Sequence, residues 1–351
     1  MDVIAHIVPR LPPELDGIGD YSYSLAQNLL DRHSIKSCFI KCNNNVEADS
    51  ESLFPVIVLP EKAKQSLIES FPKDATTLLL HYSDYPYDPK HGSPYWLLNA
   101  LRELKHSRKV KLVIMFHEFP FFFLKKDLYL LPMQMHVANQ LAQLADIVLT
   151  NNSATQAQLI RLLKQPIETI AVPSNIGEPE KIPPIKNRNR WLVVFGTPGR
   201  RAKLYKCSMT DLAHISHRLG IEKIIDIGGP LSLGLDNIDG IPFIELGKKS
   251  ASDISHILLE SLAGIAYSSD NRRLSKSGVF AAYCAHGLVP IVTQSKSSSS
   301  DGLLECQNFL STKTDQKNLG TQALERVSYE ALRWYKSHDK TSHADFFARA
   351  L

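Results

Sequence analysis

The sequence has few cysteines, little excess charge and no long apolar run. Its five cysteines are scattered over 351 residues without a Cys-x-x-Cys pair, which argues against a zinc ribbon or a dithiol redox site. Lys and Arg exceed Asp and Glu by 40 to 36, well below the charge density of a dedicated nucleic-acid-binding protein. No window approaches the ~18 apolar residues of a membrane span. We therefore expect a soluble cytoplasmic protein with no nucleic-acid partner and, at most, peripheral membrane contact.

The first half of the chain alternates short β-branched runs with longer stretches of helical spacing, a pattern typical of βαβ units and a parallel sheet. A length of 351 residues favours two domains over one. The predicted strands are Val3–Val8, Thr76–Leu80, Lys111–Phe116, Ile147–Thr150 and Thr169–Val172. The predicted helices are Tyr21–Leu30, Tyr95–Leu104, Met135–Ala145 and Ala154–Leu163.

A polar, proline-rich stretch interrupts this pattern before the alternation restarts at Trp191. We predict an N-terminal Rossmann-like domain over 1–178, a linker over 179–190 and a second Rossmann-like domain over 191–320. Residues 321–351 are predicted to form a C-terminal helix that crosses back to the first domain. The fold class is α/β, with two parallel-sheet domains facing across a cleft at the carboxyl ends of their strands.

Gly17 and Gly19 lie between the first predicted strand and the first helix. A glycine-containing turn there allows a ligand close approach and directs helix N–H groups at an anion. A dinucleotide fingerprint, as in an NADP-linked reductase, is an alternative. However, Ser22 occupies its final glycine position, and eight residues separate the strand from Gly17. A plain structural turn is the other alternative.

A second glycine-containing segment follows the predicted strand Trp191–Phe195. It holds two glycines and then four cations within seven residues, a composition that suits a diphosphate. The alternative is a solvated basic loop. The four cations are Arg200, Arg201, Lys203 and Lys206.

Lys276, Ser277 and Gly278 precede an apolar helix that ends at Gly287. Ser277 is a good N-cap, and a helix N-terminus with a lysine beside it is a second candidate anion site. An ordinary capped core helix is compatible with the same residues.

His117 ends the predicted strand Lys111–Phe116, where a histidine could bind substrate or transfer a proton. A buried structural histidine is the alternative. The segment Phe121–Lys126 then places aromatic residues beside two lysines, which suits a lipid surface or a hydrophobic acceptor, although burial between the domains is an equal alternative.

Six segments in order resemble one family, the glycogen-synthase-like retaining glycosyltransferases of the GT-B fold, called family 4. The resemblance extends from Ile7 to about Val292. The segments are GIGDYSYSLAQNL, LVIMFHEFP, ADIVLTNNSATQAQL, IAVPSNIGEP, FGTPGRRAKLYK and SKSGVFAAYCAHGLVPIV.

This resemblance implies transfer of a sugar from a nucleotide-diphosphate sugar to a hydroxyl acceptor, with retention of configuration and without a metal or other cofactor. Gly17 and Gly19 would lie under the donor diphosphate or the sugar, and His117 near the sugar or acceptor. The resemblance further implies that the diphosphate is held by cations and by helix amides. These residues are Arg201, Lys206, Ser277 and Gly278.

The sequence departs from the family at a pair of glutamates that usually stand eight residues apart. Leu274 and Ala282 occupy those places, and no acidic residue occurs from Asn271 to Leu288. The nucleotide is therefore left open, and we expect Lys276 to supply a compensating cation. Two alternatives remain: a GT-B-like binding or scaffold protein without turnover, and an NADP-linked reductase.

Overall fold

The computed structural model describes the chain except residues 1–2, 15, 44–51, 121–129, 269–270 and 294–299. The predicted membrane-contact segment Phe121–Lys126 lies outside the described residues. The chain divides into two compact units: unit 1 comprises 1–170 and 340–351, and unit 2 comprises 171–339. None of the described helices is long and apolar enough to cross a bilayer.

Unit 1 contains a seven-stranded sheet in the order β3-β2-β1-β4-β5-β6-β7. Every neighbouring pair is parallel, as buried Val-, Ile- and Leu-rich strands favour. The strands are β1 (Val3–Val8), β2 (Lys36–Lys41), β3 (Val56–Val58), β4 (Ala75–Tyr82), β5 (Lys111–Phe116), β6 (Ile147–Thr150) and β7 (Glu168–Thr169).

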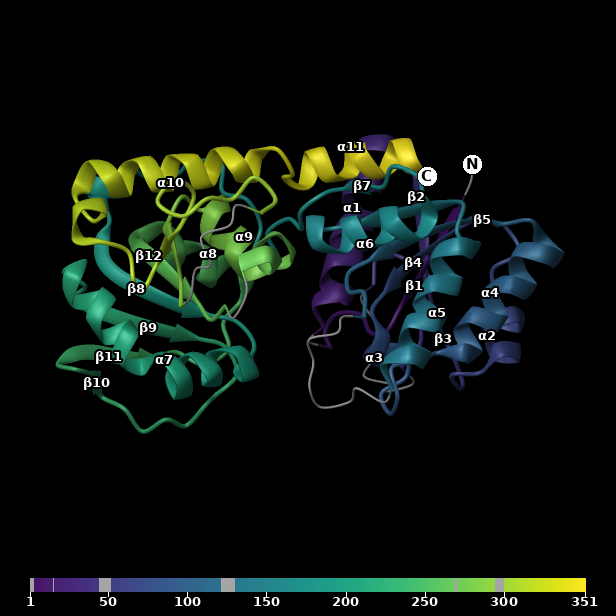
Figure 1. Cartoon of the computed structure of the whole chain (residues 1–351), viewed down its shortest axis with the longest axis horizontal. Helices are drawn as coiled ribbons and strands as arrows, with labels where there is room; N and C mark the ends of the chain where they lie inside the picture. The colour runs from purple at the N-terminus through teal and green to yellow at the C-terminus, as the bar shows by residue number, and fades with distance from the viewer. Residues whose placement is uncertain (1–2, 15, 44–51, 121–129, 269–270, 294–299) are drawn as a thin grey trace. The chain divides into compact units, whose positions relative to one another are not determined.

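Helices cover both faces of this sheet. One face packs into a single apolar core against α2 (Lys64–Ser70), α4 (Tyr95–Arg108), α5 (Leu131–Leu144) and α6 (Ser153–Leu163). The opposite face carries α1 (Gly17–His33) and α11 (Lys340–Ala350), which lie side by side (Figure 1). The short helix α3 (Asp84–Tyr87) follows β4.

Unit 2 contains a second seven-stranded sheet, in the order β10-β11-β9-β8-β12-β13-β14. Its neighbouring strands are parallel except for the antiparallel β10–β11 pair. The strands are β8 (Asn189–Phe195), β9 (Lys223–Ile227), β10 (Asn237–Ile238), β11 (Ile241–Glu245), β12 (Ser261–Ala266), β13 (Val289–Val292) and β14 (Leu310–Ser311).

The helices of unit 2 also lie on both faces of their sheet. Residues of α7 (Pro198–Arg218) pack on one face, and residues of α8 (Ala251–Glu260) and α9 (Gly278–Ala285) pack on the other. Helix α10 (Thr321–Lys336) packs against α9 (Figure 1). The described residues of unit 2 also form three short 3-10 helices, Ile185–Asn187, Asn271–Lys276 and Gln316–Asn318.

The predicted linker packs into unit 2. Ile185 is buried in its core, and the Arg188 guanidinium donates to the carbonyl oxygens of Pro183, Ser261 and His286. Such a satisfied, buried arginine fixes the segment to unit 2, so the division falls at Ile170 rather than near residue 178. Likewise, residues 321–351 form two helices, of which α10 belongs to unit 2 and α11 to unit 1.

Candidate functional site

A row of histidines crosses the sheet of unit 1. His6 lies in β1, His81 in β4, and His117 directly follows β5. His6 Nδ1 is 3.2 Å from His81 Nε2, and His81 Nδ1 is 3.2 Å from His117 Nε2. Their ring planes are 11° and 27° apart, so the three imidazoles form one continuous hydrogen-bonded line.

The sheet register explains this row. His6 pairs with Leu79 of β4, and His81, two residues further on, pairs with Met115 of β5. His117 again lies two residues beyond Met115. Because side chains alternate between faces with a period of two, each step along this diagonal stays on the α1 face.

Polar residues end the row on both sides. At the β2 side, His6 Nε2 is 3.1 Å from Ser37 Oγ. At the β6 side, His117 Nδ1 is 3.4 Å from Nδ2 of Asn151, the residue that directly follows β6. Burial lowers the pKa of His6 to about 3 and that of His81 well below its usual value, so both rings are neutral at neutral pH.

Tyr21 of α1 covers the row. Its ring lies edge-on to His117 at 4.7 Å between centroids and to His81 at 5.6 Å. The Tyr21 hydroxyl lies 2.5 Å from Nε2 of His343, which comes from α11. The first turns of α1 and His117 therefore share one end of the unit 1 sheet.

Gly17 and Gly19 lie within the first turn of α1, not in a loop before it. The helix starts there because Asp16 is the N-cap and its carboxylate accepts from the Gly19 N–H at 3.0 Å. A Cβ on Gly19 would meet the carbonyl oxygen of Arg10 at 2.4 Å, so this close approach requires glycine. A Cβ on Gly17 would meet none of the described atoms within 4 Å, so the described residues leave room for a ligand beside the backbone there.

Arg201 lies in the interior of unit 2. Its side chain is 1% exposed and forms an ion pair with Asp226 of β9. The same guanidinium donates to the carbonyl oxygens of Gly196 (Nε, 3.0 Å) and Gly229. Tyr205 donates to the second Asp226 oxygen at 2.5 Å. Arg201 therefore ties together the segments that follow β8 and β9.

Lys206 lies on a different face of the same helix. The predicted cationic segment is helical from Pro198 onward, and five residues of α-helix rotate the side chain direction by about 140°. Arg201 is accordingly buried while Lys206 is exposed, and Lys206 makes no ion pair with any residue that the structure describes.

The start of α9 lies beside the segment that directly follows β8, at the carboxyl edge of the unit 2 sheet. The predicted N-cap is confirmed, because Ser277 Oγ accepts from the Phe280 N–H at 3.2 Å. Val279 lies close to Gly196: a Cβ added to Gly196 would be 3.3 Å from Cγ2 of Val279. Lys276, Ser277 and Gly278 are half-buried.

The positions at which the resembled family has glutamates hold buried apolar side chains. Leu274 is 4% exposed and packs with Phe280, whereas Ala282 is fully buried in the cluster that joins α8 and α9. The structure thus brings the start of α9 and the α7 segment together in unit 2, and the start of α1 and His117 together in unit 1.

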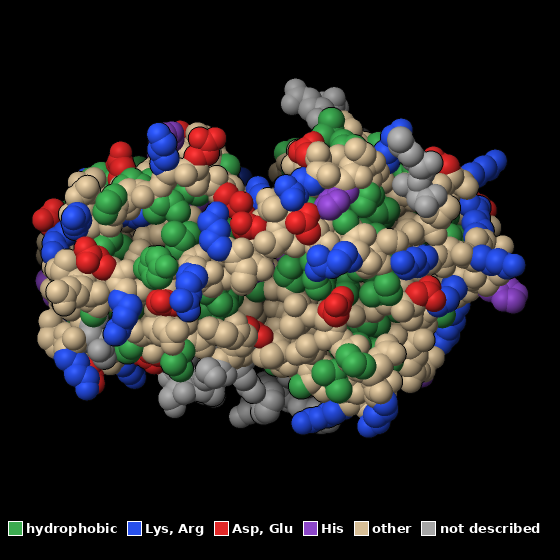
Figure 2. All heavy atoms as spheres, turned by 90° about the horizontal axis from the view of Figure 1, so that it is seen from above, with side chains coloured by type: hydrophobic (Ala, Val, Ile, Leu, Met, Phe, Trp, Pro, Cys, Tyr) green, Lys and Arg blue, Asp and Glu red, His purple; other side chains and the backbone are tan. Residues whose placement is uncertain are grey.

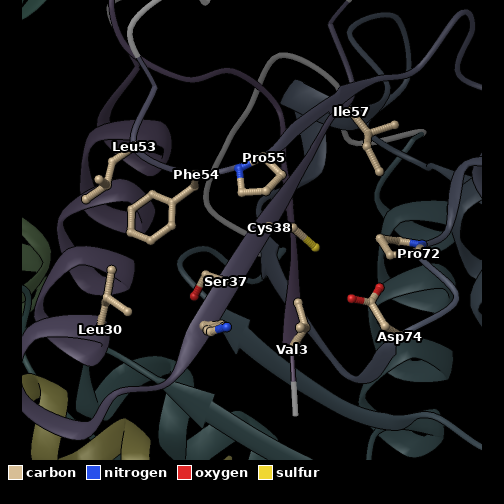
Figure 3. Close-up of a pocket in the computed structure, with 11 residues that line it drawn as sticks. Val3, Leu30, Ser37, Cys38, Leu53, Phe54, Pro55, Ile57, Pro72 and Asp74 are labelled. Carbon is tan, nitrogen blue, oxygen red and sulfur yellow. The ribbon is translucent and has the colours of Figure 1, made fainter. Parts of the chain in front are cut away.

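A cavity of about 670 Å³ lies elsewhere, at the amino ends of the unit 1 strands (Figure 3). It is bounded by the first residues of β1 and β2, by the end of α1 and by the segment before β4. Its lining includes Val3, Lys36, Ser37, Phe54 and Asp74. Ser37 therefore places one end of the histidine row at this cavity.

The described residues contain no group of three His, Cys, Asp or Glu side chains arranged to hold a metal ion. Figure 2 shows one face of the molecule, on which Lys and Arg are interspersed with Asp and Glu.

Sequence reasoning identified His117 but missed His6, His81, Asn151 and Tyr21. A signal was present, because VIAHIV and LLLHY each place one histidine in an otherwise apolar strand. A histidine inside such a strand must find a buried partner. Choosing that partner requires the strand order.

No protein-family model matches the sequence, and no curated protein matches it. Solved structures do match over its full length. An alpha-glucosyltransferase in complex with UDP and a 13-mer DNA is 10% identical, with a TM-score of 0.62 over 99% of this chain and 98% of that chain. Anabaena Alr3699/HepE in complex with UDP-glucose is 13% identical, with a TM-score of 0.61 over 99% of this chain and 100% of that chain.

The same architecture also occurs in an epimerase. UDP-GlcNAc 2-epimerase from Neisseria meningitidis bound to UDP-GlcNAc is 11% identical, with a TM-score of 0.59 over 99% of each chain. These similarities establish the predicted fold class: the chain has the two Rossmann-like parallel-sheet units of the GT-B fold. At such low identity they show the fold alone.

Proposed function

We propose that this protein transfers a glycosyl group from a nucleotide-diphosphate sugar to a hydroxyl acceptor. The observation that carries the proposal is the full-length GT-B fold, shared with proteins solved with UDP or UDP-glucose. The resemblance of six sequence segments to family 4 adds support. Retention of configuration and independence of a metal are parts of this proposal.

The diphosphate would bind in unit 2, at the start of α9. The first backbone N–H groups of a helix have no acceptor within the helix and carry its positive dipole end, which favours an anion. Lys276 precedes this turn, and exposed Lys206 supplies a second cation. Negative charge that develops on the departing diphosphate would be stabilised there.

Arg201 has a different proposed role. Its guanidinium already pairs with Asp226 and holds the Gly196 and Gly229 carbonyls. Since Gly196 contacts Val279, Arg201 would keep the segment after β8 in place beside the α9 start rather than meet the phosphates itself. It is thus a positioning residue in this proposal.

Unit 1 would bind the acceptor and the sugar at the end of its sheet that carries His117 and the start of α1. Both ring nitrogens of His117 are engaged by His81 and Asn151, so the ring serves as a fixed wall of the site. Open space at Gly17 would admit the ligand to the backbone.

A GT-B-like binding protein without turnover is the second candidate. The buried Leu274 and Ala282 favour it, because neither can supply the carboxylates that the resembled family places there. Such a protein would bind the donor and release no product.

Calorimetry with a panel of nucleoside diphosphates, nucleotide-diphosphate sugars and NADPH tests donor binding, and a product assay with hydroxyl acceptors tests transfer. We expect a nucleoside diphosphate to bind and Lys276→Ala to weaken it about tenfold, the effect of one charge-assisted contact of ~1.4 kcal/mol. Lys186→Ala is the matched control, because Lys186 is an exposed lysine before β8, at the amino ends of the unit 2 strands, and its removal should leave affinity unchanged.

Three outcomes separate the readings. Binding with transfer supports the proposed enzyme, whereas binding without transfer or hydrolysis supports the binding protein. Binding of NADPH in place of every nucleoside diphosphate would contradict both. Equal affinities of the Lys276→Ala and Lys186→Ala variants would remove Lys276 from the site.

A further inference from the structure

The direction of every hydrogen bond in the histidine row can be followed from one backbone group. The N–H of Thr155 can only donate, and it donates to Asn152 Oδ1 at 2.9 Å. Asn152 therefore presents its NH₂ group to the other side. That group donates to Asn151 Oδ1 at 2.9 Å, so Asn151 in turn presents its NH₂ group to His117.

The same logic continues through the rings. A neutral imidazole has one N–H donor and one acceptor nitrogen. His117 Nδ1 faces the Asn151 NH₂ and must accept, so Nε2 carries the proton and donates to His81 Nδ1. His81 Nε2–H then donates to His6 Nδ1, which leaves His6 Nε2–H to donate to Ser37 Oγ.

We propose that Asn151 and Asn152 are positioning residues that hold His117, His81 and His6 together in the Nε2–H tautomer. The N-cap of α6 thus sets the tautomers of a histidine row that crosses three neighbouring strands, β1, β4 and β5. Neutral rings are required, and the low pKa values of His6 and His81 agree with this.

The arrangement behaves as a unit because a single reversed ring would place two donors or two acceptors face to face. In the buried interior such a mismatch leaves polar groups without a hydrogen-bond partner, which is unfavourable. All of the rings therefore reverse, or none does. A proton at Nδ1 of His117 would likewise set an N–H against the Asn151 NH₂, so the pair favours the Nε2–H tautomer of this ring.

The assignment of tautomers stands on the hydrogen bonds alone. Its catalytic consequence rests on the proposed function: His117 would be a neutral ring whose proton points into the protein, not a group that takes a proton from the acceptor.

Long-range ¹H–¹⁵N correlation spectra of the full-length protein test this inference, because the two ring nitrogens of each imidazole report its tautomer. We expect Nε2–H for all three histidines. In Asn152→Asp the carboxylate still accepts from the Thr155 N–H but cannot donate to Asn151. The Asn151 amide should then turn, and all three rings should change to Nδ1–H.

Asn28→Asp is the matched control, an amide-to-carboxylate change on α1 that should leave the three tautomers unchanged. Ser37→Ala, which keeps Asn152 intact, is a second variant in case Asn152→Asp does not fold. Because Asn151 and Asn152 determine the tautomers in this proposal, the three rings should stay Nε2–H in Ser37→Ala.

An Nδ1–H tautomer in the unmodified protein would overturn the inference. So would unchanged rings in Asn152→Asp, or reversal in Ser37→Ala. Since the readout is spectroscopic, the inference can fail while glycosyl transfer is found, and it can hold while transfer is absent.

Discussion

The two units share a sheet architecture, but two of their buried polar arrangements differ in kind. Unit 1 carries a line of imidazoles, closed by Ser37 and Asn151. Unit 2 carries an ion pair between Arg201 and Asp226, in which both side chains are at most 1% exposed. The line of imidazoles depends on hydrogen-bond direction, whereas the buried pair depends on charge compensation, because an unpaired buried charge is far more costly.

Two buried carboxyls make this contrast testable. Asp226 has a cation partner, although burial raises its pKa and Tyr205 and Arg201 act against that rise. Asp84 of unit 1 is buried, and within the described ranges no cation pairs with it and its Oδ1 has no hydrogen-bond partner. The same amide substitution should therefore have opposite effects at the two sites.

The largest effect is expected for Asp226→Asn, which leaves the Arg201 charge without compensation. We expect unit 2 to lose about 3–5 kcal/mol of unfolding free energy. Urea denaturation followed by tryptophan fluorescence in a Trp96→Phe background reports unit 2, because Trp191 and Trp334 remain there.

The exposed Asp236 provides the control for this change, since Asp236→Asn should alter stability by less than about 0.5 kcal/mol. Replacing both partners, as Arg201→Met with Asp226→Leu, should cost less than Asp226→Asn alone. Equal stability of the Asp226→Asn and Asp236→Asn variants would refute a charge-compensating role for Asp226.

A pH-dependent effect of the opposite sign is expected at Asp84. Burial, with the nearby Glu118 charge, raises the pKa of Asp84 to about 7 from an ordinary value of 3.8. Between these pH values the folded protein holds a proton that the unfolded chain has released, so this group's contribution to stability falls as pH rises through the window. Asp84→Asn removes that loss.

We expect Asp84→Asn to raise the unfolding free energy of unit 1 at pH 8.5, by up to about 4 kcal/mol, and to change it little below pH 4. Trp96 fluorescence in a Trp191→Phe, Trp334→Phe background gives the readout. Stabilisation that is equal at both pH values would instead indicate a packing effect.

The smallest effect is expected at the helix caps. Ser277→Ala removes one acceptor from α9 and should cost unit 2 about 1 kcal/mol. Asn152→Ala removes the corresponding acceptor from α6 but also the donor to Asn151, so it should cost unit 1 more. Equal losses, measured by the same two fluorescence backgrounds, would mean that the asparagine pair adds nothing beyond a cap.

Much of the fold could be predicted from local sequence. The strands Val3–Val8, Lys111–Phe116 and Ile147–Thr150 have the predicted bounds, because buried parallel strands leave short apolar runs bounded by polar residues. The start of α7 was missed because its first turns carry Gly199 and several cations, which resemble a loop. Pro198 at the first helical position was the available signal.

The candidate site was less accessible to sequence reasoning. Ser277 was found because an N-cap acts within three residues of its partner. The burial of Arg201 was not, because Asp226 lies 25 residues away and only the β8–β9 pairing brings the two together. The resemblance gave Arg201 and Lys206 the same role, diphosphate binding. In the structure their side chains lie on different faces of α7.

By itself, the sequence determined where strands and helices form, since those choices depend on neighbouring residues and on apolar periodicity. Only the tertiary structure decided which distant polar groups meet. His6 and His81 stand 75 residues apart, and they meet because β1 pairs with β4 in one register. A shift by one residue would turn one of them to the opposite face, and no local pattern specifies that register.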